Sequence, residues 1–339
     1  MQPTGRQPVV DVALQGAAIL DAAQVDRSKV LQRLRLRDAI FRNLTRVSAI
    51  TVLIILSGII VSLIQGSLPA LRTFGWGFLV HEVWNPVTER FGAIAAIYGT
   101  LITSIIAMLI AVPVGLFISL FLTELCPIWL RRPIGIAIEL LAGIPSIIYG
   151  IWGLFVFAPF LQQTLQPFLI DTLGEIPGIG GLFAGPPYGI GILTAGLILA
   201  IMVLPFITSI SRDVFEAVPP VLKEAAYGVG CTTWEVVRYV VLPYARVGVI
   251  GGVMLGLGRA LGETMAVTFV IGNAHRISGS ILAPGTTISA TIANEFTEAV
   301  GDLYTSSLIA LGLILFVITF IVLAIARLML MRMNARVGG

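Results

Sequence analysis

Two charged residues interrupt a long apolar stretch in the C-terminal half of the chain. Arg259 and Glu263 are the charged residues of segment 247–271, which we expect to form one helix. Residues four apart share one face of a helix. Arg259 follows Arg246 by 13 residues, about 20 Å of helix, which would place it in the middle of a membrane or slightly outward. An arginine there costs about 3 kcal/mol, so we expect the pair to face a cavity or each other.

The chemistry that suits this pair is the passage of an anion. The guanidinium of Arg259 presents a planar fork of donors that fits a tetrahedral oxyanion. We expect Glu263 to hold that fork in place and to keep the solute from binding too tightly, and Thr264 and Thr268 to line nearby surface. The alternative is a structural ion pair that locks two helices together.

Glycines recur every fourth residue along the same segment. Small residues at this spacing let two helices approach closely. We expect the partner helix to belong to another subunit, because six helices alone rarely surround a solute path; packing within the chain is the alternative. The glycines are Gly248, Gly252, Gly256, Gly258 and Gly262.

The segment 212–246 is polar and is punctuated like two short helices. Two prolines can open the first helix, two glycines can end it, and a Thr and Glu three residues apart form a capping box for the second. We expect the second helix to end before Pro243. The punctuating residues are Pro219, Pro220, Gly228, Gly230, Thr232 and Glu235.

The composition places these elements in a membrane. Of the 339 residues, 57% are hydrophobic and 12% are charged, where a soluble domain carries about 25% charged residues. The mean hydropathy is +0.98. These values argue against ordinary aqueous folding and against disorder, and the weakly positive net charge of +3 does not suggest nucleic-acid binding.

Six segments are long and apolar enough to cross a bilayer as helices. The fold class is therefore all-α, a polytopic membrane protein. We expect the third segment to lose helical character around Pro159 and Pro167 and the fourth helix to begin near Pro187. The segments are 47–64, 91–123, 140–170, 176–211, 247–271 and 303–326.

The basic residues predict the orientation of these helices. With the N-terminus in the cytoplasm, 17 of the Lys and Arg residues fall on the inner side and 3 on the outer side. This asymmetry predicts that both termini are cytoplasmic. We expect residues 1–29 to be unstructured and 30–46 to form either an amphipathic helix on the inner leaflet or a basic linker. The membrane-spanning core would then span 47–333, with a cytoplasmic tail at 334–339.

The loop at 212–246 carries a resemblance to a known family. Glu224-Ala225-Ala226, then Gly230, and then Leu242-Pro243 at fixed spacing resemble the EAA loop of MetI-like ABC-transporter permease subunits. Val240 stands where that family has isoleucine. Further runs resemble the phosphate-specific PstC type: 74–76, 98–101, 138–147 and 256–266.

This resemblance implies the rest of a phosphate importer. It implies a second permease subunit of PstA type, two ATPase subunits and an external phosphate-binding protein in a bacterial inner membrane. The six EAA residues would contact the ATPase. The chain has no P-loop, because neither lysine, Lys29 or Lys223, stands in the G-x-x-x-x-G-K-[ST] context. ATP and Mg²⁺ would therefore bind the partner, and this chain would carry no cofactor and no enzyme activity.

Three alternatives remain open at the level of the sequence. A permease for sulfate, molybdate or phosphonate would use the same arginine chemistry. A stand-alone channel or carrier would not need the cytoplasmic loop, and a membrane scaffold would use Arg259 and Glu263 only to lock two helices together.

Three outer segments are candidate docking surfaces for the binding protein: 66–90, 171–187 and 273–302. The two histidines, His81 and His275, are isolated from each other and predict no metal site.

Overall fold

A computed structural model describes the backbone of residues 8–335 and the side chains of residues 33–332. The chain divides into two units, residues 1–62 and 63–339. Within the described residues the regular structure is helical, with six helical spans long and apolar enough to cross a membrane, as predicted. The spans are Arg33–Phe74, Ile94–Leu125, Ser146–Leu173, Ile192–Glu216, Thr233–Leu261 and Asp302–Arg332.

The first helix, α1 (Pro8–Phe74), is longer than predicted. The expectation that residues 1–29 are unstructured is wrong for residues 8–29, which are helical, while residues 1–7 lie outside the described part. Segment 30–46 is helical and continues directly into the first span. The reason is local: residues 17–57 contain neither glycine nor proline, so no helix breaker separates the basic stretch from the apolar one.

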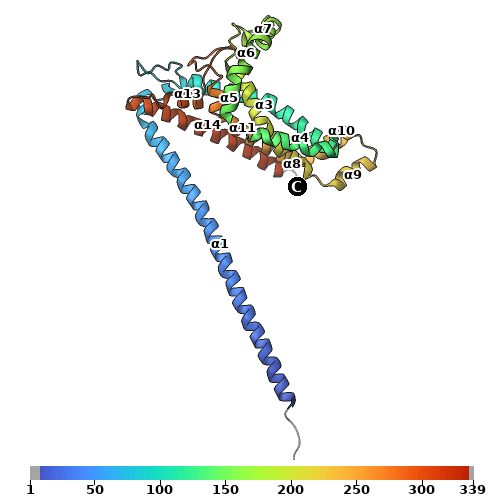
Figure 1. Cartoon of the computed structure of the whole chain (residues 1–339). Helices are drawn as coiled ribbons and strands as arrows, with labels where there is room; N and C mark the ends of the chain where they lie inside the picture. Colours follow the sequence, from blue (N-terminus) through green and yellow to red (C-terminus); the bar gives the residue numbers. More distant parts are fainter. Residues whose placement is uncertain (1–7, 336–339) are drawn as a thin grey trace, which may run out of the picture. The chain divides into compact units, whose positions relative to one another are not determined.

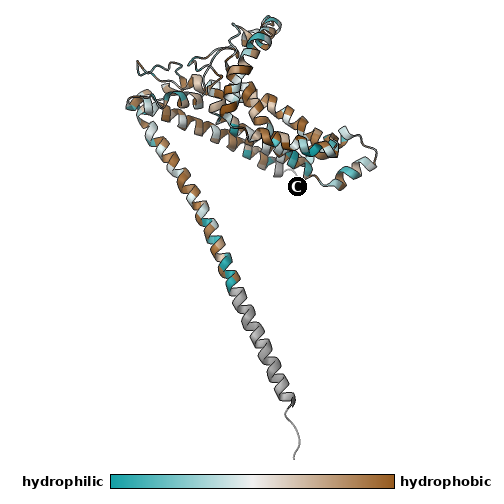
Figure 2. Cartoon of the chain, viewed as in Figure 1, coloured by the Kyte–Doolittle hydropathy of each residue, from teal (hydrophilic) through white to brown (hydrophobic). Residues whose placement is uncertain are grey.

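The core of unit 63–339 is built around α8 (Ile192–Glu216), most of whose span is buried. It packs against α3 (Ile94–Leu120), α4 (Ile128–Ala142) and α11 (Leu242–Leu261), and α11 in turn packs against α14 (Asp302–Ala335). These helices run alongside one another in Figure 1. Figure 2 shows that hydrophobic residues dominate their length. At most 28% of each of the other spans is fully buried, so much of their apolar surface is available to lipid or partner chains.

Four π-helical segments stand just before prolines. They are η1 (Phe121–Leu125), η2 (Gly153–Phe157), η3 (Leu161–Leu165) and η5 (Val237–Val241), and each ends two residues before a proline. Proline lacks an N–H and crowds the carbonyl four residues earlier, and the wider π turn relieves that conflict. Two expectations are therefore wrong. The third span stays helical past Pro159 and Pro167 instead of losing its helical character there. The second helix of the loop does not end before Pro243 but continues through it into α11.

The third span, Ser146–Leu173, is built from three short α-helices joined by π-helical turns. α5 (Ser146–Trp152), α6 (Ala158–Phe160) and α7 (Gln166–Leu173) are joined by η2 and η3, and η4 (Gly180–Phe183) follows in the next loop. α4 precedes them, and the sequence did not predict it. It is a separate helix because it ends at Gly143, just before Pro145. α8 begins at Ile192, a few residues later than expected.

The predicted fifth helix is broken. α11 ends at Leu261, residues 262–264 are non-helical, and α12 (Met265–Thr268) is a separate short turn. Gly262 follows α11 as its C-cap, a position where glycine is common. Arg259 and Glu263 therefore stand on either side of a break instead of on one continuous helix.

At the end of the bundle opposite α9, the carboxylate of Glu295 accepts hydrogen bonds from three side chains. α2 (Gly77–Val80) and α13 (Ile288–Glu295) lie at this end. Glu295 accepts hydrogen bonds from Trp84 Nε1 at 2.6 Å, Tyr304 Oη at 2.7 Å and His275 Nε2 at 2.8 Å. Burial alone would raise the pKa of Glu295, but the hydrogen bonds from these donors outweigh it, so the pKa lies below its ordinary value.

Candidate functional site

Arg259 lies in a groove on the side of the bundle. The groove has a volume of about 560 Å³ and is bordered by α8, α11 and α14. Arg259 is exposed and Glu263 is half-buried. The groove is therefore open to whatever lies beside this chain, and Arg259 is not sealed between helices of its own subunit. The lining residues are Phe206, Met254, Leu255, Gly258, Arg259, Gly262, Glu263, Thr319 and Leu323.

The guanidinium of Arg259 rests on an aromatic ring. Its Cζ lies 4.3 Å from the centroid of the Phe206 ring. Such cation–π contacts contribute about 0.5–2 kcal/mol, more when desolvated, which offsets part of the cost of placing the charge there. Phe206 lies near the middle of α8, fourteen residues after Ile192 and ten before Glu216. Arg259 is thus held at mid-height of the bundle with its donor fork uncommitted to a carboxylate in the described residues.

Glu263 has a different role from the one predicted. Among the ion pairs of residues 33–332, none joins Glu263 to Arg259. Glu263 Oε1 instead accepts a hydrogen bond of 3.2 Å from the backbone N–H of Ala266 at the start of α12. Glu263 lines the same groove as Arg259, so the alternative that the two residues face a cavity holds. They do not pair with each other, because the helix breaks at Gly262 between them. Arg259 stands in the last turn of α11, where the negative end of the helix dipole stabilises a cation. Glu263 stands just before α12, where the positive end of that short helix stabilises an anion.

The two threonines do not line the groove. Thr264 Oγ1 donates to the carbonyl of Gly262 at 3.4 Å, and Thr268 Oγ1 donates to the carbonyl of Thr264 at 2.7 Å. Both hydroxyls thus support the break between α11 and α12. The uncharged polar residue that does line the groove is Thr319, which was not predicted from the sequence. The signal was present, because Thr319 is the only polar residue of 308–326.

Three of the five spaced glycines pack inside this chain. A Cβ added to Gly248, Gly252 or Gly256 would come within 2.6 to 2.9 Å of side-chain atoms on α8. The expectation of a subunit interface is therefore wrong for these three, and the intra-chain alternative holds. Gly258 and Gly262 differ, because they line the Arg259 groove, where an added Cβ would meet only ordinary contacts at 3.6 Å or more.

The loop in segment 212–246 folds largely as the sequence predicts. α9 (Pro220–Gly228) has Pro219 as its N-cap, and Gly230 adopts φ +91° in the turn that follows. α10 (Thr233–Val236) begins with a complete capping box between Thr232 and Glu235.

The six predicted contact residues divide by exposure. Glu224, Ala225 and Gly230 are exposed, as is Pro243 at the start of α11. Ala226 and Leu242 are partly buried and pack against an apolar cluster around Phe215 and Val236. α9 itself has no fully buried residue and presents exposed apolar side chains such as Val221. A small, protruding helix with an apolar and acidic surface suits contact with a second protein.

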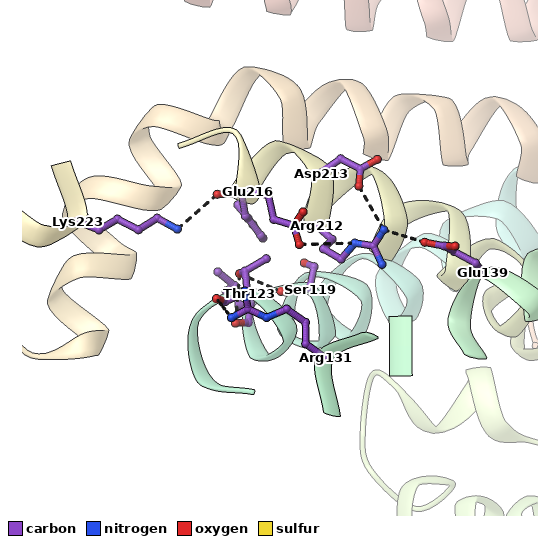
Figure 3. A network of polar contacts seen from close by, with 10 residues as sticks. Ser119, Thr123, Arg131, Glu139, Arg212, Asp213, Glu216 and Lys223 are labelled. Atoms are coloured by element: carbon purple, nitrogen blue, oxygen red, sulfur yellow. Dashed lines mark hydrogen bonds and ion pairs between the residues drawn. The ribbon is translucent and has the colours of Figure 1, made fainter. Parts of the chain in front are cut away.

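An ion network at the C-terminal end of α8 ties this helix to α4. Arg212 Nη2 lies 2.7 Å from Glu139 Oε1 and 3.4 Å from Asp213 Oδ1, and Arg212 Nε lies 4.0 Å from Glu216 Oε1 (Figure 3). Glu139 thereby links α4 to α8. Arg131 Nη2 donates to the carbonyl of Thr123 at 2.7 Å beside this network.

The chain is similar to known transport proteins. Residues 111–335 match the family described as binding-protein-dependent transport system inner membrane component. The phosphate transport system permease protein PstC of Mesorhizobium japonicum is 71% identical over 319 residues, covering 94% of this chain and 98% of the relative. The protein of the same name from Pasteurella multocida is 58% identical over 301 residues, covering 89% and 94%.

A solved structure shares the fold. A chain in the crystal structure of a bacterial alginate ABC transporter with an alginate pentasaccharide-bound periplasmic protein aligns with a TM-score of 0.57 at 17% identity, covering 86% of this chain and 93% of that one. At this identity the likeness shows the fold alone. Six apolar helices and the family match make the chain a multi-pass membrane protein. On these findings, the chain belongs to the binding-protein-dependent transport system inner membrane component family and, within it, to the PstC-type permease subunits.

Proposed function

We propose that this chain is the permease subunit of an ATP-driven phosphate importer and forms half of the translocation path. The substrate is that of the relatives named as phosphate transport system permeases, one of them 71% identical. The observation that carries the proposal is Arg259, whose guanidinium lies at mid-height of the bundle in an open groove. In that setting a fork of donors can be satisfied by a passing oxyanion.

The assembly that this function needs has other subunits. We propose a second permease of PstA type against the open groove, two ATPase subunits that hold ATP and Mg²⁺, and an external phosphate-binding protein. We propose that the chain lies in the bacterial inner membrane with both termini cytoplasmic; the distribution of 17 inner against 3 outer basic residues supports this orientation. This chain would carry no cofactor of its own.

The expected cycle is alternating access. The loaded binding protein docks on outer segments 66–90, 171–187 and 273–302, and the ATPase closes on the exposed surface of α9. Glu224 would supply a charged anchor, Ala225 and Ala226 allow close approach, and the turn at Gly230 aims the helix. Phosphate then passes Arg259, whose guanidinium offers several hydrogen-bond donors. Because Arg259 rests on Phe206 in an open groove, the phosphate is not enclosed, and its binding stays weak enough for release.

The direct test is uptake by the reconstituted complex. Proteoliposomes holding this chain, its partner permease, the ATPase and the binding protein should accumulate labelled phosphate only with ATP. Excess unlabelled phosphate should compete, and sulfate, molybdate and phosphonate should not. Competition by one of those anions instead would replace phosphate as the substrate, and uptake without the ATPase would indicate a channel or carrier.

A further inference from the structure

One ion pair holds the protruding loop helix to the membrane bundle. Lys223 Nζ, on α9, lies 2.6 Å from Glu124 Oε1 on η1, the segment that continues α3. The Glu124 side chain is 6% exposed and that of Lys223 is 19% exposed. The same ammonium lies 3.5 Å from the carbonyl oxygen of Phe215, in the last turn of α8. Lys223 therefore reaches the ends of both α3 and α8, where a cation is favourable.

Packing holds this part of the loop less firmly. α9 has no fully buried residue. Between the end of α3 and α10 there is a depression of about 270 Å³, and Glu124 is part of its lining. The side chains that line this space are mostly apolar and leave it unfilled. The ion pair is thus the short, directional contact between α9 and the end of α3.

The two helices reached by Lys223 are packed against each other, and one of them, α8, carries the ring on which Arg259 rests. α3 and α8 pack along their lengths, and the approach is close enough that an added Cβ at Gly196 would lie 2.6 Å from Ile106 Cγ2. α8 also carries Phe206, on which Arg259 rests at 4.3 Å. A displacement of α9 that pulls on Glu124 is therefore carried to the groove by packed, stiff elements.

We propose that the Lys223–Glu124 ion pair is the link that passes movement of α9 to the α3–α8 pair and so couples the ATPase to the groove. This inference rests on the proposed function. Lys223 acts here as a positioning residue, since it touches neither solute nor nucleotide. Figure 3 shows Lys223 reaching from the loop toward the end of α8.

The test separates coupling from folding. Removing one partner leaves a buried lone charge and can destabilise the protein, so the main variant is the neutral double change Glu124→Gln with Lys223→Met. In the full reconstituted complex we expect it to assemble and to hydrolyse ATP, while phosphate transported per ATP falls roughly fivefold, within the range found for residues on a coupling path. The single variant Lys223→Arg, which keeps the ion pair with Glu124, should retain the unaltered ratio of phosphate transported per ATP.

The control removes a charge from the same loop. Arg238, whose Cζ lies 5.6 Å from the ring centroid of Tyr239, is exposed, and Arg238→Met should leave the ratio unchanged. An unchanged ratio in the neutral double variant would overturn the proposal. So would its failure to assemble, because the pair would then be a folding requirement. If the unaltered complex takes up no phosphate, it is the proposed function that fails.

Discussion

Replacing Gly256 by alanine should destabilise the packing of α11 on α8. A Cβ at this position would lie 2.9 Å from Ile207 Cγ1 and 3.1 Å from Val203 Cγ1, and both side chains are fully buried. Carbon atoms rest at about 3.5–4.0 Å, so Ile207 must withdraw by roughly 0.6–1 Å into a filled core. Overpacking of this kind costs about 1–3 kcal/mol.

The matched control is Gly251→Ala in the same helix. Nothing lies within 4 Å of an added Cβ at Gly251. The gain from replacing a helical glycine by alanine, about 0.5–1 kcal/mol, applies to both variants and cancels in the comparison. Unfolding of the purified chain in a denaturing-detergent titration should therefore show Gly256→Ala to be less stable than Gly251→Ala by about 1–3 kcal/mol. Equal stability of the two variants would refute the intra-chain packing of these glycines.

Two further predictions concern the ends of the bundle. Because the folded-state pKa of Glu295 is depressed, its stabilisation is present above the ordinary glutamate pKa of about 4.3 and is lost as pH falls through the lower folded value. Glu295→Gln should remove this acid-side loss from the pH dependence of the melting temperature, and an identical drop in both proteins would contradict the assignment. Glu139→Gln should cost about 1 kcal/mol or less, because the contact to Arg212 is short but Glu139 is half-exposed. Asp213→Asn, at 3.4 Å and more exposed, should be close to neutral in the same assay, and the reverse order would argue against the Arg212–Glu139 pair.

Features that depend on composition and local chain chemistry could be predicted from the sequence. The six spans follow from length and apolarity, and the capping box at Thr232 and the positive φ at Gly230 follow from residue type at fixed spacing. Arg259 was found because a charge inside an apolar segment needs a reason. None of these inferences requires knowledge of which helix lies beside which.

Features that depend on neighbours could not be predicted. The spacing of Gly248, Gly252 and Gly256 indicates close packing but does not say that the partner is α8 of the same chain. Hydropathy stays high across Gly262, so it hides the break that separates Arg259 from Glu263. α4 was missed because its arginines and Pro133 read as a loop, although the helix contacts α8 through a face that only the fold defines.

The central claim is that the Arg259 guanidinium serves the passage of phosphate. Its most direct test is phosphate uptake by proteoliposomes holding the complete complex with Arg259→Gln, with Arg259→Lys measured alongside. A charge-assisted hydrogen bond contributes about 1.5–3 kcal/mol, so the glutamine variant should assemble normally and lose roughly tenfold or more of its uptake, with the lysine variant in between. Uptake at the unaltered rate by an assembled Arg259→Gln complex would contradict the claim.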